Sequence, residues 1–391
     1  MIAAFIGALS LLTWIYLLLA RGGFWRMRID AEPSDGPLAP TQRIAIVVPA
    51  RNEAATVARA VQSLLRQDYA GPAHVFLVDD HSSDGTTEVA NRAADEVGAS
   101  ERLNVFRARP LPDGWTGKLW AVSQGLQAAA DFNADYFLLT DADVVHQPGN
   151  LVGLVLRAER GELDLASLMV KLHCQSFAER LLIPAFVFFF FKVYPPAWAA
   201  RGDRRTAAAA GGCMLVRASA LDGIGGIAAI RDQIIDDCAL ARAVKSGGGR
   251  IWLGPTSSAS SLRSYEGWAE ISHMISRTAF TQLRHSTVLL LAVIAGMVVT
   301  YAVPPILLFC WPLWGMWAAA FAMAAWLLQS IAYRPTLRLY GLSPLWAPVL
   351  PLAALFYLGA TVSSAVEYWQ GRGGLWKGRV QDPSSSWSAR S

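Results

Sequence analysis

The chain has 391 residues, of which 53% are hydrophobic and only 16% are charged. This composition is too apolar for a water-soluble protein of this size and predicts a membrane protein. The formal net charge of +4 is small, and no Lys/Arg-rich stripe with interleaved aromatic residues occurs, so we expect no nucleic-acid partner.

The apolar residues concentrate at the two ends of the chain. Residues 1–20 carry no charged side chain, and residues 288–369 carry few, namely Arg334, Arg338 and Glu367. A helix needs about 20 apolar residues to cross a bilayer. We therefore predict an N-terminal transmembrane anchor at 1–21, a transmembrane region of about three segments at 288–370 and a polar tail at 371–391, with a water-soluble middle.

The first segment resembles an uncleaved anchor more than a secretory signal. It has no basic residue before its apolar run, and the Ala-Arg-Gly-Gly sequence at 20–23 is a poor cleavage site. Arg21, Arg26 and Arg28 follow it, which by the positive-inside rule predicts a cytoplasmic middle domain. The cysteines lack the spacing of a disulfide framework or a zinc site and fit a reducing cytosol: Cys174, Cys213, Cys238 and Cys310.

After a linker at 22–42, apolar runs alternate with segments of helical spacing. We expect strands at Ile44–Val48, ended by Pro49, and at Val75–Val78, Leu103–Phe106, Tyr136–Leu139 and Asp164–Val170. We expect helices at Ala54–Gln67, Thr86–Val97 and Lys118–Ala130. Short connections between them predict right-handed βαβ units and a parallel sheet covered on both faces.

Three polar clusters follow expected strands: Arg51-Asn52-Glu53, Asp79-Asp80, and Asp141 with Asp143. Ligands of such sheets bind at the carboxyl ends of the strands, where Mg²⁺ takes one or two carboxylates plus substrate phosphates. The Asp141/Asp143 pair alone is equally well explained as a turn. Three clusters together favour a nucleotide site built from carboxylates and a metal, since neither GxGxxG nor a P-loop motif is present.

The segment Leu181–Phe191 is strongly apolar, too short to span a membrane and contains Pro184. We interpret 181–198 as an apolar segment that lies in the membrane interface or re-enters it, with an aromatic core segment as the alternative. Arg201, Arg204 and Arg205 follow and are placed to meet lipid phosphates.

Two further motifs come later in the chain. Gly211 and Gly212 allow the backbone to approach a ligand closely. Asp236 and Asp237 precede or begin a helix expected at Asp237–Lys245, where capping of the helix by Asp is the alternative explanation.

The order of these motifs resembles the family 2 glycosyltransferases with the GT-A fold, an α/β fold. The segments that carry the resemblance occur between about Ile44 and Leu253: IVVPARNE, LVDDHSSDGT, TDADV, GGCMLVR and IIDDCAL. With the membrane segments and the stretches GWTGKLWA and RTAFTQL, the chain looks most like the hopanoid-biosynthesis-associated glycosyltransferases and more distantly like ceramide glucosyltransferases. The resemblance implies a catalytic domain at 43–265, a membrane-interface helix at 266–287 and a multi-pass protein of the bacterial inner membrane.

The resemblance also implies roles for single residues. Asp237 would be the catalytic base, and Asp143 with Asp141 would hold Mg²⁺ or Mn²⁺ on the donor diphosphate. Asp79 and Asp80 would hold the base and ribose of the nucleotide sugar. The remaining donor-site residues would be Pro49, Arg51, Glu53, Lys118, Gly211, Gly212, Asp236 and Arg277, although Lys118 is equally well explained as a solvated surface lysine.

The chain departs from the family pattern at two places. Asp236-Asp237 replaces the usual Glu-Asp, and the QxxRW motif of processive members is reduced to Arg277 followed by Thr278. The missing Trp favours transfer of one sugar to a membrane lipid over chain extension. A processive polysaccharide synthase and a non-catalytic scaffold that binds a nucleotide sugar remain alternatives.

The C-terminal region contains three apolar segments, Val288–Phe309, Leu313–Ala332 and Trp346–Trp369. Basic residues lie both before and after the last one, which contradicts a simple crossing. We predict three crossings, with re-entry of the last segment as the alternative. Glu367 is then an interfacial residue or a buried functional group.

Overall fold

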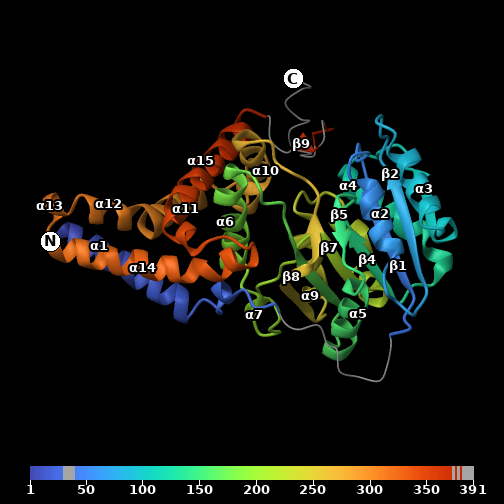
Figure 1. The fold of residues 1–391 in the computed structure, drawn as a ribbon, viewed down its shortest axis with the longest axis horizontal. Coiled ribbons are helices and arrows are strands. Elements are labelled where there is room, and N and C mark those ends of the chain that lie inside the picture. Colours follow the sequence, from blue (N-terminus) through green and yellow to red (C-terminus); the bar gives the residue numbers. More distant parts are fainter. Residues whose placement is uncertain (30–39, 372–374, 377–378, 381–391) are drawn as a thin grey trace.

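A computed structural model of the protein describes residues 1–29, 40–371, 375–376 and 379–380. The predictions for linker residues 30–39 and for Arg372 and Lys377 of the tail lie outside these residues. An α/β domain occupies one half of the molecule, and long helices from both ends of the chain occupy the other (Figure 1).

Eight strands form one sheet in the order β3-β2-β1-β4-β7-β6-β8-β5. Their bounds are β1 Ile44–Ala50, β2 Ala73–Asp79, β3 Leu103–Arg107, β4 Tyr136–Thr140, β5 Val144–His146, β6 Leu165–Lys171, β7 Cys213–Arg217 and β8 Ile251–Ser261. β9 Leu375–Trp376 and β10 Arg379–Val380 form a separate pair. All seven residues of β1 are buried, as expected for a central strand with helices on both faces.

Helices cover both faces, as the sequence predicted. Successive residues of β1 point to opposite faces, so Ile46 packs in one core and Val47 in another. The first core contains α2 Val57–Leu65, α3 Thr86–Glu96 and α5 Asn150–Gly161. The second contains α4 Gly117–Ala128, α8 Ala218–Gly223, η4 Ile227–Ile230 and α9 Asp236–Ser246.

The expectation of a parallel sheet is only partly correct. β3, β2, β1 and β4 are parallel, but β7 pairs antiparallel with β4 and β6, and β5 pairs antiparallel with β8. β1 also continues through Pro49, which we expected to end it. We did not predict β5 or β8, because a three-residue strand and a strand rich in Ser lack the continuous apolar run of a central parallel strand. We also missed β7, although its sequence CMLVR is mostly apolar.

The register explains where the site forms. β1 and β2 end together, since Ala50 pairs with Asp79, and β4 lies on the other side of β1. Because β7 is antiparallel, its first residue, Cys213, pairs with Thr140 at the end of β4. The Gly211–Gly212 segment before β7 therefore reaches the same edge as Asp141 and Asp143.

Among the described residues, five helical segments are long and apolar enough to cross a membrane: Ile2–Leu19, Phe177–Ala199, Thr287–Phe309, Met316–Leu339 and Pro344–Trp369. The second corrects our expectation of a segment too short to span. Its helix α6 runs from Phe177 to Val193, because Ser176 and Glu179 form a capping box that begins the helix ahead of the aromatic run. The short helix α7, Pro196–Ala199, follows it.

The first and last helices of the chain pack together. α1 Ile2–Leu19 and α14 Met316–Leu339 run side by side along the long axis of the molecule (Figure 1). Ala3, Ala318 and Ala322 meet Leu307 of α12 Val303–Phe309 in one cluster of mostly small side chains that allows close helix approach. The indole N–H of Trp14 donates to the carbonyl of Thr300 (2.9 Å), within a π-helical turn at Val298–Ala302 that joins α11 Thr287–Met297 to α12.

A second group of helices lies between this bundle and the α/β domain. α6, α10 Trp268–Gln282 and α15 Leu350–Trp369 pack against one another and are steeply inclined to α1 and α14 (Figure 1). The hydroxyl of Tyr357 donates to the Leu182 carbonyl (3.0 Å), and the Phe280 amide donates to Ser364 Oγ (3.1 Å). The last apolar segment thus forms a helix, α15, that packs on α6 and α10. Whether it crosses the membrane stays a prediction.

Short helical elements connect neighbouring helices and strands along the chain. They are η1 Phe24–Arg26, η2 Ser100–Arg102, η3 Ala130–Phe132, α13 Trp311–Trp314 and η6 Pro344–Val349.

Candidate active site

A cavity of about 300 Å³ opens at the edge of the sheet where β1 and β4 end. It is of the size of known ligand pockets. All of the predicted site residues except Asp79 and Asp80 line it. They are Pro49, Arg51, Glu53, Lys118, Asp141, Asp143, Gly211, Gly212, Asp236, Asp237 and Arg277. The fold thus gathers into one cavity residues that lie more than two hundred positions apart in the chain.

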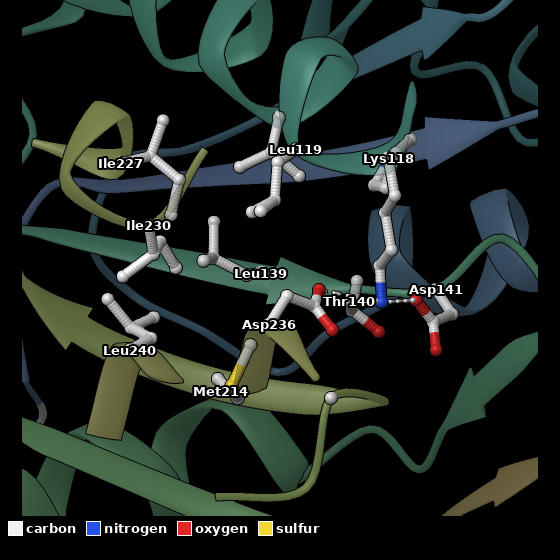
Figure 2. Close-up of a pocket in the computed structure, with 13 residues that line it drawn as sticks. Lys118, Leu119, Leu139, Thr140, Asp141, Met214, Ile227, Ile230, Asp236 and Leu240 are labelled. Carbon is white, nitrogen blue, oxygen red and sulfur yellow. Dashed lines mark ion pairs between the residues drawn. The ribbon is translucent and has the colours of Figure 1, made fainter. Parts of the chain in front are cut away.

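Lys118 lies between two carboxylates. Its Nζ is 2.9 Å from Asp141 Oδ1 and 3.3 Å from Asp236 Oδ2 (Figure 2). Burial alone would lower the pKa of Lys118, but the Asp141 and Asp236 carboxylates raise it above its ordinary value. The interpretation of Lys118 as a solvated surface lysine is therefore wrong: it is a charged residue of the cavity, held there by the N-terminal end of α4.

An apolar floor lies beside this ion cluster. Figure 2 shows aliphatic side chains from β4, α4, β7 and α9 next to Lys118, and they are Leu119, Leu139, Met214 and Leu240, with Ile227 and Ile230 from η4. A floor without polar groups reduces solvent screening, which strengthens each interaction between the charges above it.

Asp237 is tied in place by two backbone groups. The amide of Gly211 donates to Asp237 Oδ2 (2.9 Å) and the amide of Cys238 to Oδ1 (2.6 Å). Burial and the neighbouring Asp236 carboxylate raise the pKa of Asp237 above the ordinary carboxyl value, while these hydrogen bonds and Lys118 oppose the shift. A carboxyl with a raised pKa in a cavity has the properties of a general base.

The donor set suits a hard cation shared with phosphate. Asp141 and Asp143 both line the cavity, and the Asp143 carbonyl accepts from the Leu262 amide (2.7 Å), which fixes the loop to the end of β8. Within the residues that the structure describes, no group of three or more His, Cys, Asp or Glu side chains could hold a metal. Two carboxylates are the usual protein share of the ligands of Mg²⁺ or Mn²⁺ bound to a phosphate group.

Asp79 and Asp80 do not line this cavity. Asp79 accepts from the Ser82 amide (3.0 Å) and from the Thr87 hydroxyl (3.3 Å), which orders the loop that leads into α3. Asp80 is buried and pairs with Arg51, whose Nη1 lies 3.5 Å from Asp80 Oδ2 and donates to the Asp80 carbonyl (2.5 Å). Asp80 therefore acts on the cavity by orienting Arg51, and direct contacts of either carboxylate with the nucleotide stay a prediction.

Gly211 and Gly212 differ in how much room each leaves for a side chain. A Cβ on Gly212 would lie 2.9 Å from the Val170 side chain, so packing against β6 excludes larger residues there. A Cβ on Gly211 would meet Asp237 and Lys118 only at 3.4–3.5 Å, which is ordinary contact. Packing therefore requires glycine at 212 and not at 211, where the backbone amide donates to Asp237.

A buried hydrogen-bond chain holds the end of β4. Thr140 donates its only hydroxyl proton to the Gly212 carbonyl (2.8 Å), so it must accept from His146 Nε2 (2.9 Å), and His146 Nδ1 accepts from Asn150 (2.8 Å). Burial lowers the pKa of His146 to about 4, which keeps this single neutral tautomer at physiological pH. This series of hydrogen bonds links the end of β4, which precedes Asp141, to the Gly211–Gly212 segment.

Sequence patterns missed part of the lining. Arg263 and Tyr265 follow β8, a strand that the patterns did not reveal, and Tyr265 is held by its amide, which donates to the buried Glu179 (2.9 Å). An apolar part of the lining comes from β6, the residue after it, α6 and α10: Met169, Val170, Leu172, Phe186, Phe190 and Met274. The spacing of Phe186 and Phe190, one helical turn apart, was the available signal.

Comparison with known proteins agrees with this geometry. The sequence profile described as "Glycosyl transferase family 2" matches residues 45–225. A search of curated protein sequences finds no significant match. A solved structure, the mannosyltransferase PcManGT from Pyrobaculum calidifontis in complex with GDP-Man and Mn²⁺, has a TM-score of 0.56 at 17% identity, over 93% of this chain and 99% of that chain.

Two other solved structures overlap less. S. aureus TarS matches at 15% identity over 61% of this chain and 40% of its own, and M. tuberculosis glucosyl-3-phosphoglycerate synthase at 16% over 62% and 80%, each with a TM-score of 0.39. PcManGT, which is similar over nearly its full length, therefore supports the GT-A fold with apolar helices at both ends. The sequence profile identifies residues 45–225 as a glycosyltransferase family 2 domain, and the likeness to PcManGT supports the GT-A fold of this domain.

Proposed function

We propose that the protein transfers a sugar, with inversion, from a nucleoside-diphosphate sugar to a hydroxyl of a membrane lipid. The observation that carries the proposal is the two-sided cavity. Its polar wall holds Asp141, Lys118 and Asp237, and its apolar wall holds Phe186 and Phe190 of α6, a helix that packs against α10 and α15. A donor with phosphates suits the first wall, and an acceptor with a hydrocarbon body suits the second.

The donor diphosphate would lie against the ends of β1 and β4. Lys118, Arg51 and Arg277 line that part of the cavity and would neutralise phosphate oxygens, while Pro49 and Glu53 would flank the nucleotide. Asp79 and Asp80 would hold the base and ribose at the rim. PcManGT, the structural relative, was solved with GDP-Man and Mn²⁺, which supports a donor of this class.

Asp141 and Asp143 would hold Mg²⁺ or Mn²⁺ on the diphosphate. The bound ion would stabilise the negative charge that develops on the leaving nucleoside diphosphate. The Lys118 ammonium group lies 2.9 Å from Asp141. When a metal ion binds Asp141, this ammonium group would be close enough to contact a phosphate oxygen of the same donor.

Asp237 would act as the general base. Its carboxylate would take the proton of the acceptor hydroxyl while the acceptor oxygen forms a bond to the anomeric carbon. The bond from that carbon to the β-phosphate oxygen would break, and the nucleoside diphosphate would leave with the electron pair. A single displacement of this kind inverts the anomeric centre. Asp236 would keep the pKa of Asp237 raised and would orient Lys118.

The acceptor would enter from the membrane side. Apolar residues of α6 and α10 continue from the cavity into the core that these helices share with α15. A hydroxyl of a hopanoid-type lipid is the first candidate, on the resemblance of the motifs, and the catalytic domain would face the cytoplasm because Arg21, Arg26 and Arg28 follow α1.

The test is release of nucleoside diphosphate by the purified full chain in nanodiscs, across a panel of nucleotide sugars, with and without Mg²⁺ or Mn²⁺ and with and without membrane lipid extract. We expect metal-dependent release from one donor that the lipid extract stimulates, and one sugar per lipid in the product by mass spectrometry. Products with several sugars would indicate a processive synthase. Nucleotide binding without any release would indicate the non-catalytic scaffold and overturn the proposal.

A further inference from the structure

A second and larger cavity lies where the N-terminal anchor meets the α/β domain. It is a groove of about 520 Å³ whose walls come from the end of α1, the turn through η1, the helices α6 and α7, and β8. The end of α1 lies beside α7 (Figure 1). The groove therefore sits at the depth at which the first membrane helix ends, where lipid headgroups are expected.

The lining of the groove is amphipathic. Its apolar part comprises Leu18, Leu19, Phe24, Phe191 and Trp252. Its charged part consists of Arg26 and Arg28, both exposed, and no Asp or Glu lines it within the described residues. Neither arginine forms an ion pair with a carboxylate in the part of the chain that the structure describes. Among the described residues, the groove thus places two arginines without a paired carboxylate next to apolar side chains.

Other arginines extend the positive charge beside the groove. Arg21 and Arg204 lie over the ring of Trp198, at 4.7 and 5.1 Å from its centroid. Arg201 is instead neutralised by Asp203. The Arg21 side chain also donates to the carbonyls of Lys192 and Val193 at the end of α6 (3.0 and 3.2 Å), which fixes the anchor to that helix.

The groove is separate from the active site, although both use α6. Phe186 and Phe190 line the active-site cavity, while Phe191 lines the groove. Neighbouring residues of a helix point about 100° apart, so the two cavities lie on different faces of α6. The two cavities have no lining residue in common.

We propose that this groove binds an anionic phospholipid, with its phosphate headgroup at Arg26 and Arg28 and part of an acyl chain along Leu18, Leu19 and Phe24. Charge complementarity selects an anion, and the apolar lining at the end of a membrane helix selects a lipid over a free phosphate. The bound lipid packs the anchor against α6 and β8. This site does not depend on which sugar or acceptor the enzyme uses.

The test compares the full-length wild type with the R26Q/R28Q double variant in nanodiscs of phosphatidylcholine with increasing phosphatidylglycerol. Bound lipid is identified by native mass spectrometry after transfer to detergent. We expect one phosphatidylglycerol to remain on the wild type and its apparent affinity to fall by roughly thirtyfold in the variant, since each arginine near an anionic surface contributes a factor of roughly five.

The matched control is R66Q/R92Q, which removes two exposed arginines, one directly after α2 and one within α3, at the far side of the molecule from α1 (Figure 1). It should retain the lipid. Equal loss in both variants would show a general surface-charge effect, and no loss in R26Q/R28Q would show that the arginines do not bind the headgroup. Displacement of the lipid by millimolar glycerol phosphate, or equal retention of phosphatidylcholine, would also overturn the proposal.

Discussion

The two walls of the active-site cavity differ in how they are built. On the polar wall, Asp141, Asp143, Asp236 and Asp237 lie at the ends of strands or the start of a helix, and backbone pairing fixes where they meet. On the apolar wall, Phe186 and Phe190 are positioned by α6, which packs against other helices and is held by a few hydrogen bonds such as that from Tyr357 to the Leu182 carbonyl. Under the proposed function, the polar wall would carry the chemistry on a frame fixed by strand pairing, and the apolar wall would select the acceptor.

The largest expected effect concerns the polar wall, at Asp143. Asp143→Asn removes one of two carboxylates available for the metal, and we expect transfer to fall by about a thousandfold or more, with loss of metal-dependent donor binding. Isothermal titration with a nucleotide sugar, with and without Mn²⁺, measures the binding. Asp232→Asn, on an exposed loop, is the control. Unchanged metal-dependent binding in Asp143→Asn would refute the role of this carboxylate.

Asp237→Asn should separate chemistry from donor binding. The amide keeps the size of the side chain but cannot take the acceptor proton, so we expect kcat to fall by about 10²–10⁴ while donor affinity stays within a few-fold of wild type. Single-turnover transfer and a binding titration on the same preparation provide both values. Turnover near the wild-type rate would show that another group is the base.

Changes in the apolar wall should have a smaller effect, and this effect should be on acceptor binding and not on donor binding or chemistry. Phe186→Ala with Phe190→Ala removes apolar contact with the acceptor, so we expect its KM to rise by about tenfold or more while donor affinity is unchanged. Phe309→Ala truncates a side chain that is 73% exposed at the far end of the helical bundle and serves as the control. An equal change in donor affinity would mean that the two walls do not serve different substrates.

The smallest expected effect is on pH dependence. The base must be deprotonated, and the pKa of Asp237 is raised, so kcat/KM should fall as pH decreases through a value above that of an ordinary carboxyl group. Asp236→Asn removes one cause of the raised pKa, so the acidic limb should move to lower pH. A shift to higher pH, or no shift, would show that Asp236 does not tune the base.

Sequence reasoning succeeded where backbone and side chain are specified locally. The apolar runs of β1, β2 and β4 and the carboxylates after them could be recognised because a buried strand followed by Asp leaves a local pattern. It failed at β5, β7 and β8, whose partners are distant in the chain. It also judged the apolar segment from Leu181 too short to span, because the helix begins four residues earlier, at a capping box that lies before the apolar run.

By itself, the sequence indicated the α/β class, the long apolar helices near both ends of the chain and the carboxylates that follow the strands, since these depend on composition, periodicity and short motifs. Only the tertiary structure decided that Lys118 bridges Asp141 and Asp236, that Asp80 acts through Arg51, and that α6 separates two cavities. The physical reason is that ion pairs, desolvation and cavity walls arise between residues far apart in the chain, and antiparallel pairing of β7 brings its first residues, not its last, to the site.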